Sequence, residues 1–329
     1  MIVRARSWCR VDLAGGTLDL WPLGVLHPGS CTVNVAIDLP VTVTLRHRRE
    51  GYGLIQDGRQ LAAASLEELA TFEDGRLAGL VARFLELPPC EIEFASGSPR
   101  GGGLGASSAL VVAFLAAGHA FLEHPVGDGH QLAAVARDLE AQLMGLPTGI
   151  QDHYPGLLGG ALELTYPPGG HRVATLATDL EALGDSLIVA YSGQSHFSAG
   201  ANWQIVRRRL EAEPETTELL GGIGRVARQL SEALAARNLP EVGRLLSEEW
   251  SQRRRLAVGI STARLEELLT AGLAAGAWGG KACGAGGGGS LAFLAPPETR
   301  RAVVAALEGL GAEVIDTRPT TRALEVTVE

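Results

Sequence analysis

A chain of 329 residues can bury a large hydrophobic core in one or two domains. Its 46% hydrophobic and 20% charged residues exclude a largely disordered protein. The formal net charge of −9 argues against nucleic acid as the main partner, because binding to a phosphate backbone requires a basic surface.

The N-terminal half is predicted to hold strands at residues 2–14, 33–47 and 91–95. Within 33–47, branched and polar residues alternate with the period of a half-buried strand. A Leu/Ala-rich stretch at 61–85 has helical spacing, and helices are also expected at 109–122 and 131–144. Ser107 and Ser108 are expected to cap the helix at 109–122.

The C-terminal half begins with an apolar strand at residues 186–190 and ends with strands at 290–294 and 323–328. Four helices are predicted between them, at 199–211, 219–236, 241–254 and 264–275. Strands and helices come in blocks rather than alternating strictly, which favours a layered α+β fold over a doubly wound sheet. The expected division is an N-terminal domain at 1–183 and a C-terminal domain at 184–329.

Features of other protein classes are missing from the sequence. No apolar run reaches the ~18 residues of a membrane span, and the histidines and cysteines show no zinc-ligand spacing. Four distant cysteines without a secretory leader indicate reduced thiols. We therefore expect a cytoplasmic protein without a membrane partner.

The most informative motif is PRGGGLGASS at residues 99–108, between a predicted strand and a predicted helix. Clustered glycines let backbone N–H groups converge, and the start of the helix adds the positive end of its dipole. The loop is therefore predicted to bind a phosphate chain. It is not a Walker loop, because no Lys-Ser/Thr pair follows the glycines.

Residues 99–109 resemble the phosphate loop of the GHMP kinases, and two further segments match this family in the expected order. RVDLAGGTLD at 10–19 is similar to the family's substrate strand and turn, and GGKACGAGGGG at 279–289 is similar to its C-terminal glycine motif. The segments GLPTGIQDHY at 145–154 and EWSQR at 249–253 extend the likeness to heptose 7-phosphate kinases and fucokinases. The resemblance implies a two-domain α+β kinase with its active site in the interdomain cleft.

The resemblance also implies roles for individual residues. Ser107 and Glu140 would hold Mg²⁺, and Asp152 would face the acceptor hydroxyl as a base or an orienting charge. From the sequence alone, Glu140 could equally be an exposed helix residue and Asp152 a turn residue. The loop expected to bind ATP consists of Pro99, Gly101, Gly102, Gly103, Leu104, Gly105, Ala106, Ser107 and Ser108.

The residues around the first glycine pair are expected to bind the acceptor. Asp19 can accept hydrogen bonds from two sugar hydroxyls, and Arg10 can stabilise the transferring charge, although a surface salt bridge would explain both residues too. Gly16 and Thr17 join this predicted acceptor site, together with Gly286 and Gly287. Heptose kinases carry Gly-Thr where this chain has Thr17-Leu18, and Lys where it has Ile150. Both differences lie beside the predicted acceptor site, so they bear on which substrate the enzyme accepts rather than on its chemistry.

The late glycine run also fits the string of a dinucleotide fingerprint, but a strand follows it where a helix is required. It is instead expected to pack against the phosphate loop and close the active site. Arginines at 207–209 and 253–255 either receive a phosphate carried by the acceptor or form a solvated helix face. Residues 195–198 are candidates for the wall of the acceptor pocket.

The predicted function is transfer of the γ-phosphoryl of ATP to a hydroxyl of a sugar or sugar phosphate, by a monomer or homodimer. A mevalonate-type or amino-acid alcohol is the alternative acceptor. A nicotinamide-dependent oxidoreductase is the alternative enzyme, because residues 101–106 also fit G-x-G-x-x-A. A non-catalytic sugar-binding regulator is the third possibility, against which the joint presence of Ser107, Glu140 and Asp152 argues.

Overall fold

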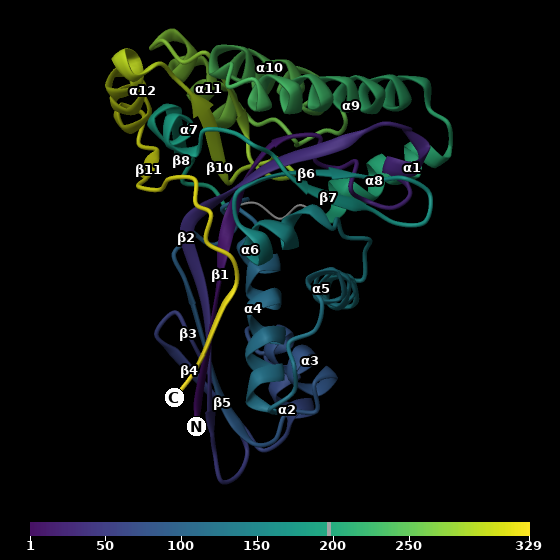
Figure 1. The fold of residues 1–329 in the computed structure, drawn as a ribbon, viewed down its shortest axis with the longest axis vertical. Helices are drawn as coiled ribbons and strands as arrows, with labels where there is room; N and C mark the ends of the chain where they lie inside the picture. The colour runs from purple at the N-terminus through teal and green to yellow at the C-terminus, as the bar shows by residue number, and fades with distance from the viewer. Residues whose placement is uncertain (196–198) are drawn as a thin grey trace.

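The computed structural model describes residues 1–195 and 199–329, and within them the strands form two sheets (Figure 1). The large sheet has eight strands, in the order β12-β1-β2-β5-β3-β4, with β6 paired to β2 and β7 paired to β6. The small sheet has four, in the order β11-β8-β10-β9. The strands are β1 (Ile2–Ala14), β2 (Cys31–His47), β3 (Tyr52–Gln56), β4 (Arg59–Ala63), β5 (Cys90–Ser96), β6 (Ala161–Thr165), β7 (Arg172–Thr175), β8 (Leu187–Tyr191), β9 (Gly279–Ala282), β10 (Ser290–Leu294), β11 (Glu313–Ile315) and β12 (Glu325–Val328).

Strand β2 organises the large sheet because it is 17 residues long, about three times an ordinary strand. Its first part pairs with β6, from Cys31 opposite Thr165, and its last part pairs with β5. The predicted alternation is confirmed, since Val41, Val43 and Leu45 are all fully buried. The fold is therefore the α+β arrangement that the sequence predicts, with antiparallel pairing throughout most of the sheet.

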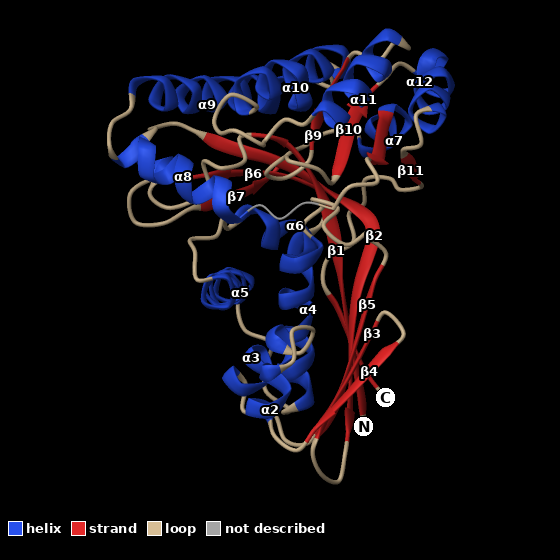
Figure 2. Ribbon diagram, turned by 180° about the vertical axis from the view of Figure 1, so that it is seen from behind, coloured by secondary structure: helices blue, strands red, loops and turns tan. Residues whose placement is uncertain are grey.

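The helix α4 (Ala106–Phe121) is the centre of the N-terminal half and is buried on almost every side, against β1 and β2. Helices α2 (Leu66–Thr71), α3 (Arg76–Phe84) and α5 (Gly129–Met144) lie on the same side of the sheet as α4 (Figure 2). The expected capping of α4 is wrong. The helix begins at Ala106 after Gly105, which has a φ of 71°, so Ser107 and Ser108 lie inside its first turn.

The stretch 61–85 is not one helix, as its spacing suggests. It contains the end of β4, then α2 with Ser65 as its N-cap, and then α3. The break follows from Gly75, where a side chain would meet the Leu69 carbonyl oxygen at 2.1 Å. Short-range periodicity does not reveal such a close backbone approach.

The C-terminal half matches its prediction closely. The four expected helices are α8 (Ala199–Leu210), α9 (Pro214–Ala235), α10 (Leu239–Arg253) and α11 (Ala263–Ala274). Helix α12 (Pro297–Gly309) has no counterpart among the predicted elements. Short helices complete the fold: α1 (Leu23–Leu26), the 3-10 helix η1 (Gln151–His153), α6 (Tyr154–Leu158) and α7 (Leu180–Ser186). None of the described helices combines the length and apolar character needed to cross a bilayer.

The last strand, β12, belongs to the large sheet rather than to the small sheet of the C-terminal half. Strand β12 pairs antiparallel with β1, and the segment before it crosses from the small sheet to the large one. Along this crossing Thr320 N donates to the Ala36 carbonyl, the Thr320 carbonyl accepts from Gly160 N, and the indole of Trp8 donates to the Ala323 carbonyl at 2.9 Å. The expected boundary at residue 183 therefore leaves out one strand that completes the N-terminal sheet.

Candidate active site

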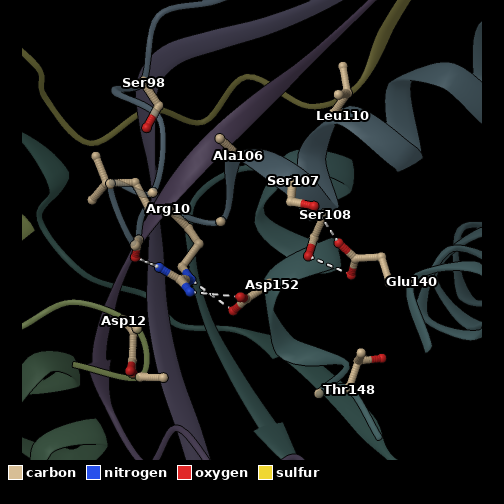
Figure 3. Close-up of a pocket in the computed structure, with 18 of the residues that line it drawn as sticks. Arg10, Asp12, Ser98, Ala106, Ser107, Ser108, Leu110, Glu140, Thr148 and Asp152 are labelled. Atoms are coloured by element: carbon tan, nitrogen blue, oxygen red, sulfur yellow. Dashed lines mark hydrogen bonds and ion pairs between the residues drawn. The ribbon is translucent and has the colours of Figure 1, made fainter. Parts of the chain in front are cut away.

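A cavity of about 540 Å³ lies where the two halves of the chain meet. Most of its wall comes from the N-terminal half: the end of β1, the glycine-rich loop after β5, α5 and η1. The C-terminal half contributes Asn202, Arg253, Gly284 and Ala285. Figure 3 shows the side chains on which the chemistry depends.

The phosphate-loop prediction agrees with the backbone geometry. Gly101, Gly103 and Gly105 have φ values of 65°, 70° and 71°, which glycine adopts without strain. The loop runs directly into the N-terminus of α4, where free N–H groups and the helix dipole favour an anion. Every loop residue predicted to bind ATP, from Pro99 to Ser108, lines the cavity.

The same loop does not fit a dinucleotide-binding fold. It follows β5, which is antiparallel to its neighbour β2, whereas that fold places the fingerprint after the first strand of a parallel sheet. The oxidoreductase alternative is therefore wrong on topology.

The late glycine run packs against the phosphate loop, as predicted. Ser290 N donates to the Gly102 carbonyl at 2.8 Å, and a side chain at Gly103 would lie 2.8 Å from the Cys283 carbonyl oxygen. Gly284 and Ala285 reach the cavity. Gly286 and Gly287, which are predicted to contact the acceptor, instead lie against Ile260, whose carbonyl accepts from Gly287 N at 2.6 Å.

Ser107 and Glu140 come together although 33 residues separate them. The Ser107 hydroxyl donates to Glu140 Oε1 and the Ser108 hydroxyl donates to Oε2, both at 2.9 Å (Figure 3). The Glu140 side chain is only 7% exposed, so the alternative of an exposed helix residue is wrong. The buried ring of His153 places Nε2 at 2.9 Å from Glu140 Oε2.

The contacts around Glu140 and His153 favour the charged form of both side chains. Burial would raise the pKa of Glu140, but the contacts with His153, Ser107 and Ser108 outweigh it and lower that pKa. Burial would lower the pKa of His153, and the Glu140 carboxylate outweighs it in turn, so the His153 pKa is raised. Glu140 is therefore held as a carboxylate next to the start of α4.

Arg10 and Asp152 form a bidentate ion pair. Arg10 Nε and Nη2 donate to the two carboxylate oxygens of Asp152 at 2.9 and 2.8 Å, and Nη1 donates to the Gly103 carbonyl at 2.6 Å. The Arg10 side chain is buried, whereas Asp152 remains 31% exposed. Arg10 thus joins the phosphate loop to a carboxylate that is open to the cavity (Figure 3).

Asp19 lies in the same cavity but does not pair with Arg10, so the alternative of a salt bridge between them is wrong. Its carboxylate accepts from the Gln151 backbone N–H at 3.2 Å, and a side chain at Gly149 would meet it at 1.8 Å. Burial raises the pKa of Asp19 to about 6, and the nearby charge of Asp152 adds to the shift.

The most prominent feature that the sequence interpretation misses is a buried group of four charges. Arg253 and Lys281 come from the C-terminal half, and their partners are Asp12 and Glu249, all at most 2% exposed. The solvated-face interpretation therefore fails for Arg253, although Arg254 and Arg255 do pair with surface glutamates. One sequence feature indicates the group: Lys281 is the only lysine in the chain.

Two other expectations concern the acceptor side. Residues 196–198 lie outside the described residues, so the expected pocket wall at 195–198 stays a prediction. The Arg207–Arg209 run lies in the last turn of α8, where Arg209 donates to the Leu26 carbonyl and to His27 Nε2. Of residues 207–209, none lines the described cavity.

Comparison with known proteins identifies the family. The model of the GHMP kinases N terminal domain matches residues 73–160, and the model of the GHMP kinases C terminal domain matches residues 230–312. The chain is 26% identical over 322 residues to D-glycero-alpha-D-manno-heptose 7-phosphate kinase of Campylobacter jejuni, covering 93% of both chains. It is 31% identical over 239 residues to a mevalonate kinase of Pyrococcus abyssi, covering 71% of this chain and 68% of that one.

The structural comparison agrees with these matches. The crystal structure of a D-glycero-D-manno-heptose 1-phosphate kinase from Bacteriodes thetaiotaomicron superposes with a TM-score of 0.77 at 22% identity, over 99% of each chain. The two proteins therefore share a fold. In this chain that fold carries the phosphate loop, the buried Ser107–Glu140 pair and the Arg10–Asp152 pair. This chain belongs to the GHMP kinases, a family of ATP-dependent kinases.

Proposed function

We propose that this enzyme transfers the γ-phosphoryl of ATP to a hydroxyl of a sugar or sugar phosphate, with a heptose 7-phosphate-type acceptor as the expected class. The observation that carries the proposal is the shared cavity. It combines a glycine loop built for phosphates, an acid–hydroxyl pair at the helix start, and a carboxylate that Arg10 fixes in place. A cytoplasmic location and a monomeric or homodimeric state are part of the same proposal.

The residues at the start of α4 fit Mg²⁺. Oxygen atoms are the ligands this cation prefers, and Ser107 Oγ and Glu140 Oε1 would hold it. The two oxygens already lie side by side, 2.9 Å apart, at the edge of the cavity that the phosphate loop lines. Among the described residues no group of three or more His, Cys, Asp or Glu side chains could hold a metal by itself. The cation held there would supply positive charge that neutralises the phosphates of the nucleotide.

The remaining residues divide the work of the transfer. Backbone N–H groups of the loop and the α4 dipole bind the phosphate chain, and Arg10 offers positive charge beside it. Asp152 keeps lone pairs free after accepting from Arg10, because a carboxylate has about four acceptor positions. It therefore orients the acceptor hydroxyl toward the γ-phosphorus and accepts its proton as the bond forms.

The charge of the cavity favours a sugar over a mevalonate-type alcohol. Asp12, Asp19 and Asp152 all line it, and its Arg10 and Arg253 already donate to carboxylates. Sugar hydroxyls can donate hydrogen bonds to these oxygens, whereas any anionic group of the acceptor would be repelled from them. The argument therefore favours the hydroxyl-bearing part of a sugar beside these carboxylates, and the heptose-kinase relative supports a sugar acceptor as well.

An ADP-release assay tests the proposal directly. Purified enzyme with ATP and Mg²⁺ is offered D-glycero-D-manno-heptose 7-phosphate, free hexoses, L-fucose and mevalonate in turn. We expect release with one of the sugars and none with mevalonate. Turnover of mevalonate alone would assign the alcohol kinase activity instead, and turnover of no acceptor would contradict the kinase proposal.

Acceptor binding is expected to weaken as the pH falls through about 6, because that is the pKa of Asp19. Above this pH its carboxylate accepts two hydroxyl hydrogens, and below it the protonated group loses much of this capacity. The KM for the acceptor should rise on acidification while the KM for ATP changes little. Since the folded-state pKa of Asp19 is raised, its protonation favours the folded state as the pH falls through 6, so the titration of this group does not itself unfold the enzyme.

The control for this prediction is Asp19→Asn, which removes the titrating group. Its acceptor KM should be high at every pH and should no longer depend on pH near 6. A parent enzyme whose acceptor KM is flat between pH 5 and 7.5 would show that Asp19 does not contact the acceptor.

A further inference from the structure

Arg253, the last residue of α10, reaches from the C-terminal half into the turn that follows β1. Its Nη1 donates to Thr17 Oγ1 at 3.1 Å, and Nη2 donates to the Gly16 carbonyl at 2.8 Å. Gly16, Thr17 and Arg253 itself line the cavity. One guanidinium therefore holds both the backbone and a side chain of the loop that leads to Asp19.

Thr17 has an unusual backbone conformation. Its φ is 76°, in the left-handed region that glycine adopts freely and that β-branched residues rarely occupy. Its carbonyl accepts from Leu20 N, which closes the turn around Asp19. Such strain persists only when surrounding contacts enforce it, and Arg253 donates both to the side chain of this residue and to the carbonyl that precedes it.

Arg253 is fixed in turn by the buried charges behind it. Nε and Nη2 donate to Glu249 Oε1 at 2.8 and 2.6 Å. The Lys281 ammonium lies between Glu249 Oε2 at 3.1 Å and Asp12 Oδ2 at 3.3 Å. Two cations thus balance two carboxylates, and the cations outweigh burial to lower the pKa of Asp12.

This group joins the two halves of the protein beside the acceptor site. Asp12 belongs to β1 of the large sheet, whereas Glu249, Arg253 and Lys281 belong to α10 and β9. A buried ion group is a weak source of stability, because removing charges from water offsets their attraction. Its geometric effect is more definite, since it fixes one guanidinium to the acceptor turn.

We propose that Arg253 is a positioning residue for acceptor binding. It holds Thr17 in the left-handed conformation, and this conformation directs the Asp19 carboxylate into the cavity. The inference rests on the proposed kinase function and adds to it a residue of the C-terminal half that acts on the acceptor without contacting it.

Three substitutions at Thr17 separate this role from direct contact. Thr17→Val keeps the branched shape and the strain but cannot accept the hydrogen bond, so the acceptor KM should rise about tenfold, as for one lost charge-assisted bond. Thr17→Gly loses the bond and the strain together, so its acceptor KM should rise several-fold less than that of Thr17→Val. Thr17→Ser keeps the hydroxyl, so its acceptor KM should also rise less than that of Thr17→Val. The KM for ATP should be unchanged in all three.

The arginine itself is tested in two backgrounds. Arg253→Lys should raise the acceptor KM about tenfold in the parent, because an ammonium cannot reproduce the fork that holds Gly16, Thr17 and Glu249. In the Thr17→Gly background, where no strain needs to be held, the same change should have less than a threefold effect. Arg254→Lys, on the neighbouring surface pair with Glu266, is the matched control and should leave both KM values unaltered.

The probe is D-glycero-D-manno-heptose 7-phosphate, or whichever sugar of the ADP-release panel turns over fastest. Equal losses in Thr17→Val and Thr17→Gly would overturn the inference and make the Thr17 hydroxyl a direct acceptor contact. Additive effects of Thr17→Gly and Arg253→Lys would overturn it too. If Arg253→Lys does not fold, the Thr17 series decides alone. A parent without kinase activity would instead contradict the proposed function, and this inference with it.

Discussion

Replacing Asp152 by asparagine should lower kcat by about 10²–10⁴-fold, the range for a lost general base, while the enzyme still folds and binds Mg·ATP. Asparagine keeps the size of the side chain and one oxygen for Arg10, but it cannot take the proton of the acceptor hydroxyl. If the transition state is loose and metaphosphate-like, little deprotonation is needed, and the loss should lie near 10². Single-turnover rates at saturating ATP and acceptor measure the chemical step directly.

The structure makes one control necessary for this variant. Asp152 neutralises the buried Arg10, so a change in the phosphate loop could imitate a catalytic effect. Binding of Mg·ATP should therefore be measured alongside the rate. Asp185→Asn, which alters an exposed Asp–Arg pair of 2.7 Å, should stay within twofold of the parent. An Asp152→Asn enzyme within threefold of the parent, with intact binding, would remove Asp152 from the mechanism.

Glu140→Gln should reduce kcat/KM by about 10²–10³-fold, the scale of one lost electrostatic contact at a reacting phosphate. The amide can still accept from Ser107 or Ser108, but it has no charge to offer a divalent cation and leaves the buried His153 without its carboxylate. The decisive measurement is a Mg²⁺ titration of the initial rate. The midpoint should move to higher Mg²⁺ concentration, and part of the lost rate should return there.

Two comparisons make the Glu140 result specific. Glu140→Asp retains the charge on a shorter side chain and should recover some of the lost Mg²⁺ response. Glu248→Gln, on the exposed face of α10, should behave as the parent. If Glu140→Gln needs no more Mg²⁺ than the parent, the residue is only a structural partner of α4.

Local sequence patterns were sufficient to predict those parts of the structure that a single continuous segment forms. The phosphate loop needs glycines at alternate positions and a helix directly after them, and both are visible in residues 99–109. The four helices of the C-terminal half were equally visible from their apolar spacing. The pairing of Ser107 with Glu140 came from the family resemblance, since periodicity alone left Glu140 as an exposed residue.

Contacts between distant segments could not be predicted in this way. The partner of Arg10 is 142 residues away, and the partner of Arg253 at Thr17 is 236 residues away. Arg253 is also followed in the sequence by two surface arginines, so the local composition of residues 253–255 resembles that of a solvated helix face. The error at Gly286 and Gly287 has the same origin, because only the packing on Ile260 decides which glycines of the run turn toward the cavity.

The return of β12 to β1 has a consequence for biosynthesis. Until residues 325–328 have left the ribosome, β1 is an edge strand along residues 3–6. The N-terminal sheet therefore cannot be finished before β12 has been synthesised, even though domains often fold as they emerge. Ile2 and Glu329 also lie side by side, since they exchange backbone hydrogen bonds of 2.8 Å. A short linker between these two residues, with the chain opened instead in an exposed loop, would produce a permuted enzyme in which β12 and β1 are synthesised consecutively.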